Sequence, residues 1–188
     1  MYAIFSLLSP QIEQSVRSIW KELETECGLS GIRMTPIPHF SWQVAEHYDI
    51  PMIENVLGLI GARTEPFVVH TTGLGVFTGP QPVVYAAMVK DSGLVNMHQM
   101  IWEATFPYAQ NLSPFYEVDD WMPHITLTYR DVETEKLGCA LERLAYRPMD
   151  WEIEVRQLVL GEQVENRVGE IIATFNLGEQ SPRVRQSQ

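Results

Sequence analysis

Two short stretches of the sequence repeat one pattern of side chains that could do acid/base chemistry. They are PHFSW, residues 38–42, and PHITL, residues 123–127. Each has a proline before a histidine and a hydroxyl residue two positions after it. Residues two apart in a β-strand point to the same face of the sheet, about 7 Å apart. His39 with Ser41, and His124 with Thr126, would therefore each present an imidazole beside a hydroxyl.

Two such strands facing one cleft would surround a tetrahedral anion with two acid/base groups and two hydrogen-bond donors. A neutral imidazole can activate a nucleophile while an imidazolium protonates the leaving oxygen, and each role typically contributes about 10² to 10⁴ in rate. The two hydroxyls would orient the non-bridging oxygens of a phosphate and stabilise their developing charge. The pattern favours a reaction that needs proton removal and proton donation at one phosphate.

A histidine two residues before a hydroxyl is a weak signal by itself. His70, Thr71 and Thr72 form a third match within a β-type segment. Valine precedes His70 and glycine follows Thr72, so this match lacks both the proline and the apolar continuation of the other two. We therefore assign no function to His70.

The elements that must position the two motifs follow from alternation. Residues 39–44 and 124–129 alternate apolar and polar side chains, as half-buried strands do. The residues expected to face the core are Phe40, Trp42, Val44, Ile125, Leu127 and Tyr129. The histidines and hydroxyls would lie together on the opposite faces.

The remaining elements follow from hydrophobic periodicity and capping signals. Pro10 opens a helix whose apolar stripe runs to Cys27 and which Gly28 can terminate. Further helices are expected from Asp49 to Gly61, over residues 93–104, and from a cap at Asp131 to about Tyr146. The expected strands are residues 1–8, a hairpin of 67–77 with 82–89, and a pair of 151–160 with 169–177, joined by a turn near 165–169.

This order of elements predicts an α+β protein of two related lobes, each with one motif strand. We expect residues 1–178 to form one bilobal domain and residues 179–188 to form a flexible polar tail.

Composition narrows the classes of partner. The chain has 188 residues, of which 13 are basic and 24 acidic, so its formal net charge is −11. This charge disfavours binding of a long nucleic acid through phosphate neutralisation. No stretch approaches the roughly 20 apolar residues of a membrane span, and the N-terminus lacks the pattern of a signal peptide. We expect a cytoplasmic protein, most simply a monomer, that has no membrane partner.

The side chains that could bind metal or undergo redox chemistry give a weak signal. Cys27 and Cys139 lie on helical segments without CxxC spacing, so buried thiols are expected rather than a disulfide or a zinc site. Asp119 and Asp120 are expected on a solvated loop. A zinc hydrolase built on His39 and His124 lacks a third ligand at any recognisable spacing.

The paired motifs PHFSW and PHITL resemble the signature of the 2H phosphoesterase superfamily, which includes RNA 2′,3′-cyclic phosphodiesterases historically called 2′-5′ RNA ligases. The likeness covers roughly the first 178 residues. It implies a bilobal α+β fold with pseudo-twofold symmetry, antiparallel sheets flanking a central cleft, and no metal or other cofactor. It also implies that His39 and His124 are catalytic, that Ser41 and Thr126 bind phosphate, and that the substrate is a cyclic-phosphate nucleotide or an RNA terminus.

This chain departs from the family pattern at several positions. Ser41 and Trp42 replace the commoner threonine and leucine. Tyr129 stands where members that act on RNA ends often have a basic residue. Arg130 follows, and in a regular strand it would share the face of His124 and could assist phosphate binding. With the net charge, these departures favour a small cyclic-phosphate nucleotide over polymeric RNA.

Two other features of the sequence leave alternatives open. The aromatic residues before the second motif, Phe115, Tyr116 and Trp121, could stack on a base or simply pin a long loop. The protein could be a hydrolase, or a module that binds a phosphorylated nucleotide or RNA end in the same cleft without turnover. The order of acid and base, the product regiochemistry and a reverse ligase activity also stay open.

Overall fold

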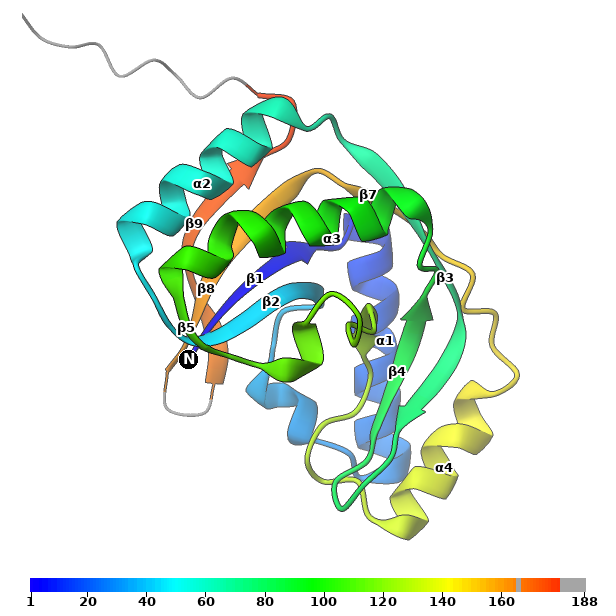
Figure 1. Cartoon of the computed structure of the whole chain (residues 1–188). Helices are drawn as coiled ribbons and strands as arrows, with labels where there is room; N and C mark the ends of the chain where they lie inside the picture. Colours follow the sequence, from blue (N-terminus) through cyan, green and yellow to red (C-terminus); the bar gives the residue numbers. More distant parts are fainter. Residues whose placement is uncertain (165–166, 180–188) are drawn as a thin grey trace, which may run out of the picture.

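The computed structural model describes residues 1–164 and 167–179 and shows an α+β fold built on two antiparallel sheets (Figure 1). The strands are β1 (Tyr2–Leu7), β2 (His39–Tyr48), β3 (Phe67–Phe77), β4 (Val83–Met88), β5 (Ala109–Leu112), β6 (His124–Thr126), β7 (Glu152–Val155), β8 (Gln157–Val164) and β9 (Arg167–Asn176). The helices are α1 (Pro10–Cys27), α2 (Ile50–Arg63), α3 (Ser92–Thr105) and α4 (Thr134–Leu144), with short 3₁₀ turns η1 (Gly31–Met34), η2 (Phe106–Tyr108) and η3 (Pro114–Tyr116). The predicted fold class is confirmed.

The two sheets have corresponding strand orders, as expected of two related lobes. The larger sheet is ordered β5-β2-β1-β8-β9 and the smaller sheet β6-β4-β3-β7. Apart from the extra strand β5, the motif strand β2 is followed by β1, β8 and β9 in the larger sheet, and the motif strand β6 is followed by β4, β3 and β7 in the smaller sheet. Every described strand pair is antiparallel.

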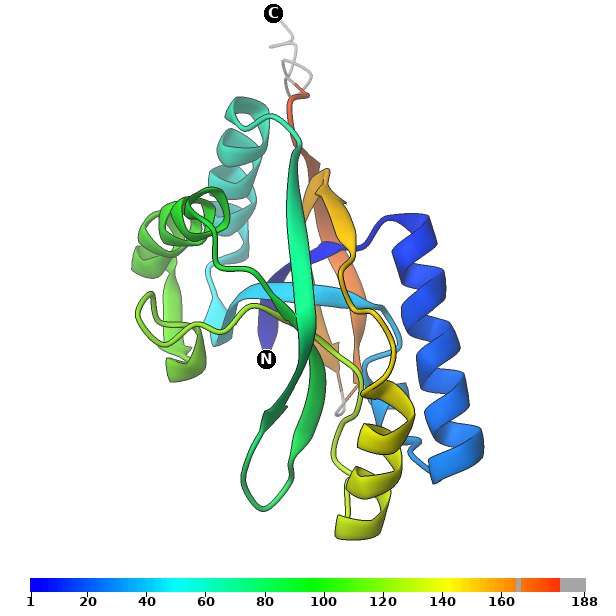
Figure 2. The same cartoon turned by 90° about the vertical axis from the view of Figure 1, so that its right-hand side faces the viewer.

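The helices pack in two pairs on opposite sides of the molecule (Figure 2). Helices α2 and α3 pack on each other, α2 against β8 and β9 and α3 against β2 of the larger sheet. Helices α1 and α4 pack on each other beside the smaller sheet. Buried apolar side chains from both sheets and all of these helices form one contiguous core.

Local signals account for most of the helix ends. Helix α1 begins at Pro10, buries the stripe that includes Ile12, Val16 and Leu23, and ends at Gly28, whose φ of 66° is the left-handed cap that glycine favours. The Asp49 carboxylate accepts a hydrogen bond from the Met52 amide and caps α2, which runs to Arg63 rather than to Gly61.

The expected cap of the fourth helix is wrong. Helix α4 begins after Glu133, and the Asp131 carboxylate instead accepts hydrogen bonds from the amides of Ser30 and Gly31 at 2.7 and 2.9 Å. A carboxylate can cap any exposed group of amides, and here the amides are a hundred residues away. Asp131 therefore joins the segment after β6 to the segment before β2.

The predicted strand over residues 151–160 is in fact two strands in different sheets. Strand β7 pairs with β3 in the smaller sheet, whereas β8 pairs with β1 in the larger sheet, and Arg156 lies between them. Apolar and polar residues alternate in both strands, so periodicity does not reveal that the chain passes from one sheet to the other at Arg156. The predicted turn falls partly on residues 165–166 and the predicted tail mostly on residues 180–188, which lie outside the described residues.

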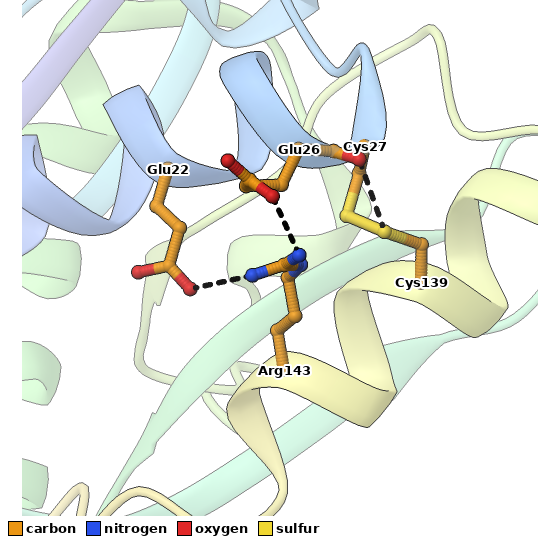
Figure 3. The surroundings of a disulfide bond; sticks show 5 residues. All are labelled: Glu22, Glu26, Cys27, Cys139 and Arg143. Atoms are coloured by element: carbon orange, nitrogen blue, oxygen red, sulfur yellow. Dashed lines mark hydrogen bonds and ion pairs between the residues drawn. A yellow bond between two sulfur atoms is a disulfide. The ribbon is translucent and has the colours of Figure 1, made fainter.

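The expectation of two free thiols is also wrong. Cys27 at the end of α1 and Cys139 on α4 form a disulfide, with their Cα atoms 5.8 Å apart (Figure 3). Arg143 lies beside it and pairs with Glu22 and Glu26 across the same helix contact, at 3.6 and 2.7 Å. The pairing depends on the packing of two helices separated by 112 residues, which Cys spacing does not show.

Among the described residues, none of the helices combines the length and the apolar character needed to cross a membrane.

Candidate active site

Both motifs line one cavity of about 800 Å³ that takes its walls from the two sheets. His39 and Ser41 reach it from β2, and His124 and Thr126 from β6. All four side chains are half-buried. The structure therefore brings together the four residues that the doubled pattern singled out, while the third match, His70, is exposed on β3 and does not line the cavity.

The two imidazoles are held in the same way. The Nδ1 atom of His39 lies 2.6 Å from the Ile37 carbonyl oxygen, and that of His124 lies 2.7 Å from the Met122 carbonyl oxygen. A carbonyl oxygen can only accept, so Nδ1 carries the proton in both rings. Nε2 is left as the nitrogen available to a ligand, either as a base when neutral or as an acid when protonated.

The cavity wall makes both imidazoles less basic than usual. Burial lowers the pKa of His39, against the opposing effect of its hydrogen bond to Ile37. Burial also lowers the pKa of His124, and the charge of His39 lowers it further. The effect of His39 on the pKa of His124 indicates that the two rings lie near each other in the cavity.

Aromatic rings pack on each histidine and supply this burial. The ring centroids of Phe5 and His39 are 4.9 Å apart, and those of Phe77 and His124 are 4.8 Å apart in an edge-to-face arrangement. Tyr85 adds a second edge-to-face contact to His124 at 5.3 Å. These contacts fix the ring planes as well as excluding water.

Two tryptophans hold the backbone at the hydroxyl residues. Trp121 Nε1 donates to the Ser41 carbonyl oxygen at 3.0 Å, and Trp20 Nε1 donates to the Thr126 carbonyl oxygen at 3.1 Å. Each indole thus ties a motif strand to another part of the chain, Trp121 from the loop before β6 and Trp20 from α1. The sequence pattern indicated no such role for Trp20, because its position in the apolar stripe of α1 already explained it.

The second motif strand ends earlier than predicted, and this changes which side chains reach the cavity. Strand β6 stops at Thr126, and the amides of Leu127 and Thr128 both donate to the Val84 carbonyl oxygen, at 2.9 and 3.1 Å, as in a β-bulge. The extra residue reverses the alternation that follows. Tyr129 lines the cavity, although its parity had predicted a core position.

Arg130 does not share the face of His124, so that expectation is wrong. Its backbone has a φ of 70°, its side chain is exposed, and its guanidinium lies over the ring of Tyr129, 5.2 Å from the centroid. It does not line the cavity. A phosphate-binding role for Arg130 stays a prediction.

The loop before β6 divides its aromatic residues between two tasks. Trp121 is buried and stacks on Trp42 and on His98, so it anchors the loop to the core. Burial lowers the pKa of His98 to about 4. Phe115 lines the cavity with 78% of its surface exposed. Tyr116 also lines it, and burial raises the pKa of its hydroxyl, against the effect of the nearby Ser41 hydroxyl.

Two carboxylates that the sequence did not single out also line the cavity. Asp120 belongs to the loop before β6, and Glu162 to β8. Asp119 and Asp120 are both exposed on this loop, as expected, and Asp120 in addition contributes to the cavity wall. Within the described ranges, no three His, Cys, Asp or Glu side chains are grouped so that they could hold a metal ion.

Fold and site together define a two-lobed α+β protein whose lobes each present a His-x-Ser/Thr strand to one cavity. The family model of the 2′-5′ RNA ligase superfamily matches residues 9–167, and the chain belongs to this superfamily. The resemblance to the 2H phosphoesterases is thereby confirmed. A sequence comparison with curated proteins finds no significant match.

Solved structures show the same fold at low sequence identity. TT0787 of Thermus thermophilus has a TM-score of 0.66 and 14% identity, with 96% of this chain and 99% of that chain covered. A protein described as a phosphoesterase has a TM-score of 0.61 and 16% identity, covering 95% and 98%. E. coli LigT complexed with 3′-AMP has a TM-score of 0.59 and 14% identity, also covering 95% and 98%.

Proposed function

We propose that this protein is a metal-independent phosphoesterase that hydrolyses a cyclic phosphodiester, the 2′,3′-cyclic phosphate of a nucleotide or RNA end. The observation that carries the proposal is the matched pair of imidazoles. His39 and His124 line one cavity from two different sheets. The Nδ1 atom of each is hydrogen-bonded to a backbone carbonyl oxygen, and a hydroxyl residue follows each histidine two positions later.

The geometry supports an in-line displacement at phosphorus, in which water replaces a ribose oxygen. One neutral histidine removes a proton from water as the water oxygen bonds to phosphorus, while the other, as imidazolium, protonates the ribose oxygen whose bond to phosphorus breaks. The Ser41 and Thr126 hydroxyls donate to the non-bridging oxygens. The histidines end with their protonation states exchanged, and proton transfer through solvent restores them.

The superfamily and its solved members support the class of ligand. E. coli LigT has been crystallised with 3′-AMP, with ATP and with NADP+, all of which are small nucleotides. A cavity of about 800 Å³ is of the size that holds such a molecule.

The test is hydrolysis of a nucleoside 2′,3′-cyclic phosphate by chelator-treated protein. We expect wild type to turn the substrate over, and His39→Ala and His124→Ala each to lower kcat/KM by at least about 10². His70→Ala is the matched control, because it removes an exposed histidine from the third His-x-Thr match, outside the cavity. Phosphorus NMR of the product identifies the leaving oxygen.

Each outcome decides between functions. Loss of activity in both motif variants with His70→Ala unaffected supports the two-histidine mechanism. If folded wild type binds the nucleotide without turning it over, the proposal fails and the cleft belongs to a binding module.

A further inference from the structure

We propose that Asp120 and Glu162 restrict the cavity to substrates whose only anion is the reacting phosphate. The inference rests on the proposed function and narrows its substrate class from nucleotides and RNA ends to nucleoside 2′,3′-cyclic monophosphates that carry no further phosphate.

The charged side chains that line the cavity are mostly acidic. Besides the two histidines, the charged side chains that line the cavity are Asp120 and Glu162, and the described lining contains no lysine or arginine. While the histidines are neutral, the wall has no cationic side chain to pair with a second phosphate.

The two carboxylates come from different segments of the chain. Asp120 comes from the loop before β6, whereas Glu162 lies on β8, opposite Tyr2 of β1. Glu162 raises the pKa of the Tyr2 hydroxyl, chiefly through their hydrogen bond, and Tyr2 lines the same cavity. The two carboxylates thus reach one cavity from separate segments of the chain, and both contribute negative charge to its lining.

The consequence for a ligand follows from its charge. A nucleoside 2′,3′-cyclic phosphate has one negative charge, which the imidazoles and hydroxyls can hold, and its ribose and base offer O–H and N–H donors that a carboxylate accepts. A 5′-phosphate or an upstream RNA linkage adds anions that nothing in the described wall compensates. Two like charges about 10 Å apart change an equilibrium constant by about 2-fold in water and about 15-fold at an effective dielectric constant of about 20.

The experiment compares two substrates that differ only in charge. Adenosine 2′,3′-cyclic phosphate and its 5′-phosphorylated form are assayed with wild type, Asp120→Asn, Glu162→Gln and the double variant. We expect wild type to prefer the first substrate by at least about 10-fold in kcat/KM, each single variant to narrow this ratio by about 2- to 15-fold, and the double variant to narrow it further.

The matched controls remove the same charge close by but outside the cavity. Asp119→Asn alters the neighbour of Asp120, and Glu170→Gln alters the exposed residue paired with Glu162 across β8 and β9. Neither control lines the cavity. We expect both to change the ratio less than Asp120→Asn and Glu162→Gln do, which separates the effect of the lining carboxylates from that of the net charge of the protein.

Binding measurements keep this inference separate from the proposed function. Calorimetry with 3′-AMP and with adenosine 3′,5′-bisphosphate requires no turnover and should show the same preference and the same response to the variants. Absence of hydrolysis with charge-dependent binding intact would overturn the proposed function alone. Equal ratios in wild type, Asp120→Asn and Glu162→Gln would overturn the carboxylate selectivity.

Discussion

Each imidazole of the candidate site is oriented by the residue that precedes the motif proline. Ile37 and Met122 supply the carbonyl oxygens that accept from Nδ1 of His39 and His124. A residue before proline is confined to extended conformations, so Pro38 and Pro123 limit the directions in which those carbonyls can point. The proline in the repeated pattern thus has a structural role: it helps to keep Nδ1 hydrogen-bonded, which leaves Nε2 available to a ligand in both motifs.

The lowered pKa values of the two histidines predict an acid-shifted pH profile. We expect kcat/KM to be bell-shaped with its maximum below about pH 6.5, the ordinary pKa of histidine, because burial lowers the pKa of both rings in the free enzyme. A bound phosphate anion favours imidazolium, so the kcat profile should lie at higher pH. Rates measured from about pH 4 to 8 test this, and a kcat/KM maximum above about pH 7 would contradict it.

At the scale of the elements, the site depends on contacts that join each motif strand to a distant segment. Trp121 and Trp20 bind the carbonyls of Ser41 and Thr126, and Asp131 binds the amides of Ser30 and Gly31. An added Cβ on Gly31 would lie 1.8 Å from the Tyr129 carbonyl oxygen, so the two chain segments touch at the backbone. These contacts join both motif strands to segments far away in the sequence.

Removing either indole N–H should therefore lower catalytic activity. We expect Trp20→Phe and Trp121→Phe each to lower kcat/KM by about 10- to 100-fold, because small displacements of catalytic groups cost about that much. Each variant should also lose about 1 kcal/mol of unfolding free energy with the hydrogen bond, and Trp121→Phe should lose more because its smaller ring leaves a cavity in the core. Steady-state kinetics and urea denaturation separate the two effects.

Trp102→Phe is the control, since within the described part of the chain the Trp102 indole makes no side-chain hydrogen bond. Activity losses no larger than that of Trp102→Phe would show that the indoles do not position the motifs.

At the scale of the whole molecule, the disulfide is a covalent link between two distant helices. Cys27 and Cys139 are separated by 112 positions in the sequence, and their disulfide links α1, which carries Trp20, to α4. The ion pairs of Arg143 cross the same helix contact, but such exposed pairs contribute at most about 1 kcal/mol each. The covalent link is therefore the larger contribution to holding this pair of helices.

Reducing the disulfide should destabilise the protein measurably. We expect the free energy of unfolding to fall by about 2–4 kcal/mol on reduction, because the unfolded chain gains the freedom that the cross-link removed. Urea denaturation of the oxidised and reduced protein measures this difference. The Cys27→Ser, Cys139→Ser double variant should match the reduced protein and should not respond to reductant. An unchanged midpoint and slope on reduction would contradict the prediction.

Much of the fold and the centre of the candidate site were predictable from the sequence, because alternation, apolar stripes and caps are properties of consecutive residues. They predicted β2, α1 and the hairpin of β3 and β4, and they placed His39 beside Ser41 and His124 beside Thr126. The pattern of proline, histidine and hydroxyl was informative because it occurred twice at equivalent places in the order of elements.

Only the tertiary structure decided which distant residues meet. The bulge at Val84 turned Tyr129 rather than Arg130 toward the cavity, and helix packing joined Cys27 to Cys139. Sheet pairing split residues 151–160 between two sheets and brought Glu162 into the lining of the same cavity as Asp120. The physical reason is that these outcomes depend on contacts between segments far apart in the chain, which local patterns do not specify. The sequence by itself thus determined the paired acid/base groups, and the packing of the two sheets decided the charge and shape of the cavity around them.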